Sequence, residues 1–204
     1  MEINAERLFT LIKIIGETTT KYEYDLRGNL IRANEAKYFY DATNMIAKAV
    51  TPKGEATYIY NGLRNRVKRN NQTYTLDITK PYNNLLMLDN QNFIWGNGLI
   101  GTTNVNNERY PFNEPQSYSY MQDHLGSPIH MVNYWEKNHH MITDVEKMFN
   151  SASFSYDEFG NTEDSYFANP FGFTGYMQDD ISDMYLLKLE SIVRMWVDLQ
   201  LRTF

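Results

Sequence analysis

The stretch that decides the fold reads Tyr22-Glu23-Tyr24-Asp25-Leu26-Arg27-Gly28-Asn29-Leu30-Ile31. Tyr22 and Tyr24 lie two positions apart, so on a β-strand both rings point to the same face. The next four residues have the composition of a type I turn. An Asp25 carboxylate at the first position accepts backbone N–H groups, and Gly28 at the fourth adopts φ > 0 without steric cost. The stretch therefore predicts a β-hairpin with a bulge after its turn.

The same pattern, an aromatic-x-aromatic triplet followed by a four-residue turn, occurs four more times. Asn44 replaces Gly in one copy and is among the residues that best tolerate φ > 0. Arg64 replaces Gly in another copy, at a cost of about 1 kcal/mol unless the bulge shifts onto Asn65, and we expect that corner to be the loosest. Five copies predict a repeat protein whose units stack on their neighbours. The further turns are Asp41–Asn44, Asn61–Arg64, Asp123–Gly126 and Asp157–Gly160.

The composition also indicates short antiparallel strands, because 16 Tyr and 11 Phe favour pleated surfaces while Asn and Gly populate turns. We therefore predict a mainly β fold, an antiparallel β-hairpin repeat array that forms a curved sheet segment. Two helices are expected outside the repeats. The capping-box pattern Thr143-Asp144-Val145-Glu146 predicts a short helix over 143–150, and alternating charges four residues apart from Glu190 to Arg202 predict a C-terminal helix.

The other elements are expected from local composition. Residues 1–16 are a first strand or a short helix. Residues 102–115, in which Asn and Pro gather, are expected to form a loop. Three further strands are predicted at Thr73–Ile78, Leu85–Leu88 and Phe93–Trp95.

Two sets of motifs resemble a known family. Tyr24-Asp25…Gly28-Asn29-Leu30, Tyr40-Asp41-Ala42 and Tyr60-Asn61-Gly62-Leu63 are similar to the YD repeats of RHS-type proteins. The runs Asp123–Pro128, Tyr156–Asn161 and Asn169–Tyr176 are similar to the RHS repeat-associated core. The resemblance covers about Thr18 to Tyr185. It divides the chain into a YD-repeat β-hairpin array at 1–115, a core-like region at 116–187 and a divergent tail at 188–204.

The resemblance implies a location and a role. In full-length relatives such hairpins form a β-shell that encloses a C-terminal toxin, and a complete core cleaves itself. The Asp-Pro…Gly-Arg-Phe motif that ends such a core is absent, so we expect a truncated fragment without a toxin domain. Relatives are secreted or lie at the cell surface. This chain has no signal-peptide pattern, which predicts a cytoplasmic location if it is expressed alone.

Charge and residue usage argue against several other classes. A net charge of −6 and a pI near 5.2 argue against nucleic-acid binding. No apolar run is long enough to span a membrane. Cysteine is absent, so no thiolate metal site exists. The four histidines, His124, His130, His139 and His140, lack metal-ligand spacing, so we expect neither a metal nor a cofactor.

The repeat acids are the candidates for chemistry. Asp25, Asp41, Asp123 and Asp157 could act as paired carboxylates of a glycosidase. However, backbone donors at the first turn position lower a carboxyl pKa, which is the wrong direction for a general acid. We therefore expect no enzyme and interpret these residues as structural. The full set of predicted structural turn residues is Asp25, Gly28, Asp41, Asn44, Asn61, Asp123, Gly126, Asp157, Gly160 and Gly175.

Three functions follow from this interpretation. The first is a non-catalytic structural and interaction fragment of an RHS-type polymorphic-toxin or cell-surface protein, whose partners are other shell segments or further copies of itself. The second is a carbohydrate-binding module that uses Tyr22, Tyr38 and Tyr58 as stacking surfaces. The third is the remnant of a self-cleaving core.

Overall fold

The computed structural model describes residues 7–15, 18–80, 84–105, 116–133, 152–157, 160, 162 and 169–186. In these ranges the protein is mainly β and contains no α-helix. The helices predicted over 143–150 and after residue 187 lie outside the described residues, as does the tail at 188–204. Two compact units can be recognised, and each is described by itself. The boundary between them lies between Asn71 and Gln72. The segments expected from the sequence, 1–115, 116–187 and 188–204, are divided by type of repeat, whereas the two units are divided by their packing.

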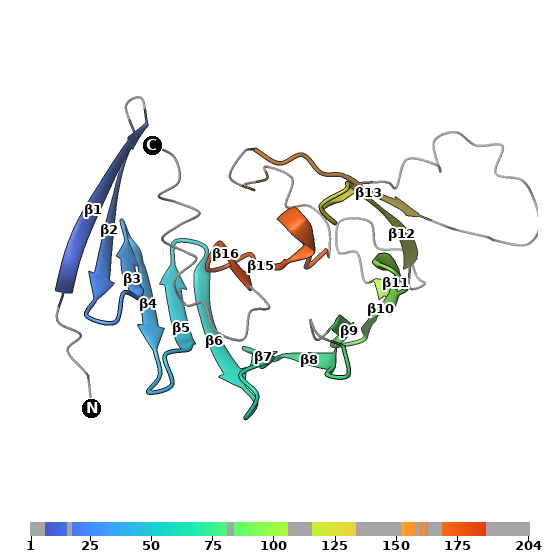
Figure 1. Cartoon of the computed structure of the whole chain (residues 1–204), viewed down its shortest axis with the longest axis horizontal. Helices are drawn as coiled ribbons and strands as arrows, with labels where there is room; N and C mark the ends of the chain where they lie inside the picture. The colour runs from blue at the N-terminus through green and yellow to red at the C-terminus, as the bar shows by residue number, and fades with distance from the viewer. Residues whose placement is uncertain are drawn as a thin grey trace, which may run out of the picture. The chain divides into compact units, whose positions relative to one another are not determined.

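The first unit is a series of antiparallel hairpins (Figure 1). Consecutive strands pair with each other, as expected for hairpins. The described part of the lead-in, Arg7–Ile15, which the sequence left open between strand and helix, is a strand. The strands are β1 (Arg7–Ile15), β2 (Thr18–Asp25), β3 (Leu30–Ala33), β4 (Ala36–Tyr40), β5 (Ile46–Thr51), β6 (Gly54–Tyr60) and β7 (Arg66–Arg69).

The second unit continues the same architecture. Its strands are β8 (Gln72–Asp77), β9 (Asn84–Leu88), β10 (Gln91–Trp95), β11 (Leu99–Val105), β12 (Gln116–Gln122), β13 (Pro128–Asn133) and β14 (Ala152–Ser153). A short 3₁₀ turn, η2 (Phe173–Gly175), and a separate hairpin of β15 (Met177–Asp179) and β16 (Met184–Leu186) follow. In the described ranges the large sheet has fourteen strands in sequence order, β1 to β14.

The expected bulges appear at the turns. Pairing shifts register just before four of the five Asp or Asn turns, because the turn adds one residue to one strand of the pair. The strands predicted at Thr73–Ile78, Leu85–Leu88 and Phe93–Trp95 correspond to β8, β9 and β10. The shifts lie between Glu23 and Tyr24, between Phe39 and Tyr40, between Ile59 and Tyr60, and between Met121 and Gln122.

Two sequence expectations need correction. The loop predicted for 102–115 is wrong at 102–105, because β11 runs to Val105 and pairs with β12; residues 106–115 lie outside the described residues. The β-branched pair Thr102 and Thr103 favours this extended backbone over a loop. The bulge at Arg64 does not move to Asn65: Arg64 itself adopts φ +62° and keeps the turn hydrogen bond from its N–H to the Asn61 carbonyl, at 3.0 Å.

One face of each strand carries the buried residues, as the period of two predicts. In β4, Ala36 and Tyr38 are buried, whereas Lys37 and Phe39 are exposed. The same alternation in β6 buries Ala56 and Tyr58. The tyrosines of the repeats therefore serve first to pack the inner face of the sheet.

The core of the second unit is formed by side chains of its sheet and of the segment 169–179. Phe171, with 2% of its surface exposed, is its centre. The ring makes edge-to-face contacts with Phe93 at 5.2 Å, with Trp95 at 5.5 Å and with Tyr120 at 6.4 Å between ring centroids. Aromatic contacts of this geometry are favourable beyond the burial of their area. The core also contains Tyr74, Leu85, Leu99, Tyr118, Met131, Phe154 and Met177.

The first prediction isolates the backbone requirement of the turn. Gly28 has φ +81°, and a Cβ there would meet no atom within 4 Å. Gly28→Ala should therefore lower the free energy of unfolding by about 1–2 kcal/mol through backbone conformation alone. Gly62, in the corresponding turn of another repeat, has equally open space but no positive φ. Gly62→Ala should be neutral or stabilising by up to about 1 kcal/mol. Urea denaturation of both variants tests this, and equal effects would contradict it.

The second prediction concerns the core. Phe171→Ala should cost about 3–5 kcal/mol in unfolding free energy, because it leaves a cavity among three aromatic rings. Phe39, on the exposed face of β4, is the matched control, and Phe39→Ala should cost less than about 1 kcal/mol. The comparison requires only chemical denaturation. A Phe171→Ala variant as stable as the Phe39→Ala variant would contradict the assignment of Phe171 to the centre of the core.

Candidate functional site

The repeated turn is the feature most strongly marked by the sequence. Asp25 Oδ1 accepts the backbone N–H of Arg27 at 2.9 Å and that of Asn29 at 2.8 Å. The N–H of Gly28 donates to the Asp25 carbonyl at 3.0 Å. One side-chain oxygen thus satisfies two donors that the turn leaves without a backbone partner.

Three other copies have the same geometry. Asp41 Oδ1 accepts the N–H of Thr43 and of Met45, at 2.8 and 3.0 Å. Asn61 and Asp123 do the same with the residues two and four positions later, at 2.8–3.0 Å. An amide oxygen therefore serves as well as a carboxylate. In the fifth copy the N–H of Gly160 donates to the Asp157 carbonyl at 3.0 Å.

These contacts shift two carboxyl pKa values downward. Burial alone would raise the pKa of Asp41, but hydrogen bonds from Met45 and Thr43 outweigh it, and the Arg64 charge adds to them. At Asp123 burial again acts upward and is outweighed by hydrogen bonds from Ser127 and Leu125. Both carboxyls remain ionised at neutral pH. A group that holds no proton cannot act as a general acid, so the geometry favours the structural interpretation.

The fourth turn position links neighbouring repeats. Asn44, with φ +69°, accepts at its Oδ1 a 2.6 Å hydrogen bond from Asn29 Nδ2 of the preceding turn. The same Nδ2 donates to Asp25 Oδ2 at 2.8 Å. Arg64, one repeat further on, acts electrostatically on Asp41. Asn44 therefore contacts the previous turn through a hydrogen bond, and Arg64 acts on it through its charge. The glycines at this position, Gly28, Gly126, Gly160 and Gly175, all have positive φ between +72° and +88°.

The three tyrosines considered for carbohydrate binding are not equally accessible. Tyr38 and Tyr58 are buried, with 7% and 6% of their surfaces exposed. The guanidinium of Arg66 lies over the Tyr58 ring, 4.8 Å from its centroid. Tyr22 is half-buried. The placement does not favour sugar stacking at Tyr38 or Tyr58, because packing already occupies these rings.

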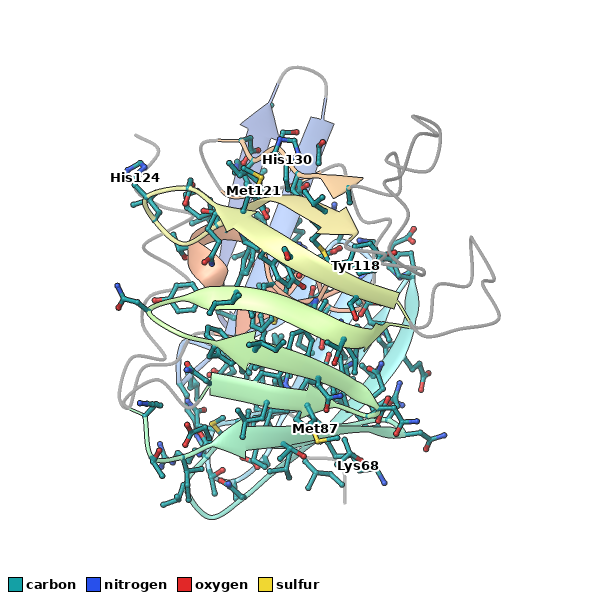
Figure 2. All side chains as sticks on the ribbon, turned by 90° about the vertical axis from the view of Figure 1, so that its right-hand side faces the viewer. Lys68, Met87, Tyr118, Met121, His124 and His130 are labelled. Atoms are coloured by element: carbon teal, nitrogen blue, oxygen red, sulfur yellow. The ribbon has the colours of Figure 1, made fainter. Side chains whose placement is uncertain are left out.

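The described histidines lie apart from each other. His124 is the second residue of the Asp123–Gly126 turn, and its side chain is exposed. His130 lies on β13 opposite Met121 of β12 (Figure 2). Its Nδ1 is 2.9 Å from the Ser153 hydroxyl. In the described ranges no group of three metal-ligating residues gathers, and no helix there is long and apolar enough to cross a membrane. His139 and His140 lie outside these ranges.

A second kind of turn joins the opposite ends of the strands and is not part of the aromatic-Asp-Gly pattern. It has two residues, and the first is Asn34, Asn70 or Asp89, each with φ near +50°. Its N–H donates to the carbonyl of a strand residue, and its side-chain oxygen accepts the N–H of that same residue. The strand residues are Lys21, Thr57 and Thr73 respectively. The sequence signal is an Asn or Asp between two strand candidates.

A third feature could not be anticipated from local sequence. The acidic turn Asp180–Asp183 belongs to the first unit, and charged and hydroxyl side chains of that unit hold it. Lys53 Nζ lies 2.5 Å from Asp183 Oδ1, and Arg69 pairs with Asp180. We call the residues that hold this turn the acidic-turn acceptor. They are Tyr38, Thr51, Lys53 and Arg69.

The third prediction tests the role of the turn oxygen. Asp41→Ala should cost about 1 kcal/mol, because two N–H groups lose their acceptor. Asp41→Asn should cost less, since Asn61 fills the same role in another repeat. Because the pKa of Asp41 is lowered from 3.8 in the folded state, its carboxylate stabilises the fold above pH 3.8. That contribution is lost as the pH falls through the lowered value.

The measurement is urea denaturation of the wild type and both variants from pH 7 to pH 2. The stability difference between the wild type and Asp41→Asn should shrink as the pH falls below 3.8. A difference that stays constant, or grows in acid, would contradict the proposed role.

No protein-family model matches the chain, and no curated protein matches it. The likeness to YD repeats rests on the quoted sequence motifs alone.

Proposed function

We propose that the chain is a non-catalytic structural and interaction module, a segment of the kind of β-shell that encloses a C-terminal toxin in full-length RHS-type proteins. One observation carries the proposal: the acidic side chains marked by the repeat are committed to turn N–H groups. Asp25, Asp41 and Asp123 each accept two backbone hydrogen bonds through a single oxygen. The repeat thus specifies a sheet rather than a reactive centre.

The core-like motifs support the same role through packing. A Cβ at Gly160 would lie 2.8 Å from the Phe173 side chain, and one at Gly172 would lie 2.7 Å from the Tyr185 ring. The Tyr185 hydroxyl donates to the Gly160 carbonyl at 2.5 Å and accepts the N–H of Phe173 at 3.3 Å. These residues join the segment after β14 to the turn before β15. Their geometry explains the glycines by close packing, without a bound substrate.

The strand edges are the expected places of interaction. In the described part of the chain, β1 pairs only with β2. An edge strand presents unpaired backbone groups that can pair with another chain. Ile12 and Ile14 of this strand are also exposed, with 59% and 68% of their surfaces accessible. Self-association through β1 follows from these features.

The fourth prediction is that the purified chain associates as its concentration rises. Size-exclusion chromatography with light scattering should give a mass that increases above 24.0 kDa. Ile12→Lys on the edge strand should reduce association, because an added charge opposes edge pairing. Ile59→Lys, equally exposed but on the interior strand β6, is the matched control and should leave association unchanged.

Two results would argue against the proposal. A strictly monomeric species at every concentration would oppose the interaction role. Intact mass measurement of the same sample should give one uncut 24.0 kDa species, and self-generated fragments would instead favour the self-cleaving alternative.

A further inference from the structure

The acidic-turn acceptor has the properties of a recognition site. Its two cations stand at the two ends of the turn, Lys53 at Asp183 and Arg69 at Asp180. Two hydroxyls bind the backbone between them: Thr51 Oγ1 donates to the Ile181 carbonyl at 2.8 Å. Tyr38 donates to the Ser182 carbonyl at 3.3 Å. The acceptor thus contacts both the charged side chains and the backbone carbonyls of this four-residue turn.

The middle of the turn is well covered while its ends are open. Ser182 has 3% of its surface exposed. By contrast, the side chains of Lys53 and Asp183 are 56% and 59% exposed, and that of Asp180 is 72% exposed. Burial and the nearby Asp183 charge, with Tyr22, raise the pKa of Tyr38 to about 12, so its hydroxyl remains a donor at neutral pH. Exposed ion pairs are individually weak and weaken further with salt.

The acceptor and the turn that it holds belong to the same unit, because residues 1–71 and Asp180–Asp183 are both part of the first unit. All four contacts described above are made to residues of the turn itself. A turn of identical sequence on another copy of the chain offers the same two carboxylates and the same two carbonyls.

We propose that the acidic-turn acceptor also binds the Asp180–Asp183 turn of a second copy, so that two chains can exchange their turns. Within one chain the covalent link gives the turn a high effective concentration, on the order of millimolar, and keeps the acceptor occupied. Exchange becomes favourable when the acceptor and the turn of one chain carry like charges, while the acceptor of one chain and the turn of the other carry opposite charges.

Charge reversal creates this situation. One chain carries Lys53→Glu and Arg69→Glu, and the other carries Asp180→Lys and Asp183→Lys. Each chain alone is mismatched, both within itself and in a homodimer. In an equimolar mixture both exchanged contacts are matched. We expect the mixture to form a species of twice the 24.0 kDa chain mass by size-exclusion chromatography with light scattering. Each chain alone should form no more of this species than the wild-type chain does at the same concentration, and about 1 M salt should dissociate the excess seen in the mixture.

Two controls make the result specific. A single chain with all four substitutions restores the match internally and should remain at the mass of the wild type at the same concentration. Edge pairing through β1 is unchanged by these substitutions, so it would appear equally in each chain alone. Circular dichroism establishes that each variant is folded. A mixture of folded variants that gives no more dimer than the separate chains would overturn the proposal.

A second experiment covers the case in which charge reversal prevents folding. The chain contains no cysteine, so a single introduced thiol is unambiguous. A Lys53→Cys chain and an Asp183→Cys chain are mixed and oxidised. A disulfide-linked heterodimer in several-fold excess over the two homodimers supports turn exchange. Heterodimer at the random yield of two parts to one of each homodimer overturns it.

Discussion

The fold depends on one side-chain oxygen at the first position of the repeated Asp or Asn turn. In four repeats this oxygen accepts the N–H groups two and four positions later, and the residue three positions later adopts φ > 0. The arrangement adds one residue to the turn and shifts the strand register just before it. Tyr24 of β2, Tyr38 of β4 and Tyr58 of β6, each just before such a turn, are all buried, so the three hairpins place these tyrosines on the core side of the sheet.

The residues of this arrangement are adjacent in sequence, which is why the sequence alone predicts it. Tyr38 and Tyr40 indicate a strand, and Asp41 with Asn44 indicates its turn. The structure confirms the bulge, the positive φ and the buried tyrosine at that hairpin. The same reasoning assigned the turn acids to structure, and the hydrogen bonds and lowered pKa of Asp41 agree with that assignment.

What the sequence could not predict depends on distant partners. Lys53 and Asp183 are 130 positions apart, and neither lies in a motif that points to the other. Arg64 was expected to loosen its corner because only its own backbone cost was considered. In the structure its charge acts on Asp41 of the preceding turn, so part of that cost is offset. Asn34 and Asn70 each bind a strand residue thirteen positions earlier, Lys21 and Thr57, a pairing that becomes visible only once the register is known.

The outer faces of the two units differ in a way that bears on function. In the first unit three exposed apolar residues stand directly opposite lysines: Ile12 opposite Lys21, Phe39 opposite Lys48, and Ile59 opposite Lys68. A lysine stem can cover apolar surface while its ammonium group opposes stacking of another sheet. In the second unit Ile94 stands opposite Gly101 and Val132 opposite Ser119, and neither partner carries a charge. Ile14 of β1 stands opposite the uncharged Thr19, so the edge strand of the first unit also carries an exposed apolar residue without a lysine opposite it, as Ile94 and Val132 do in the second unit.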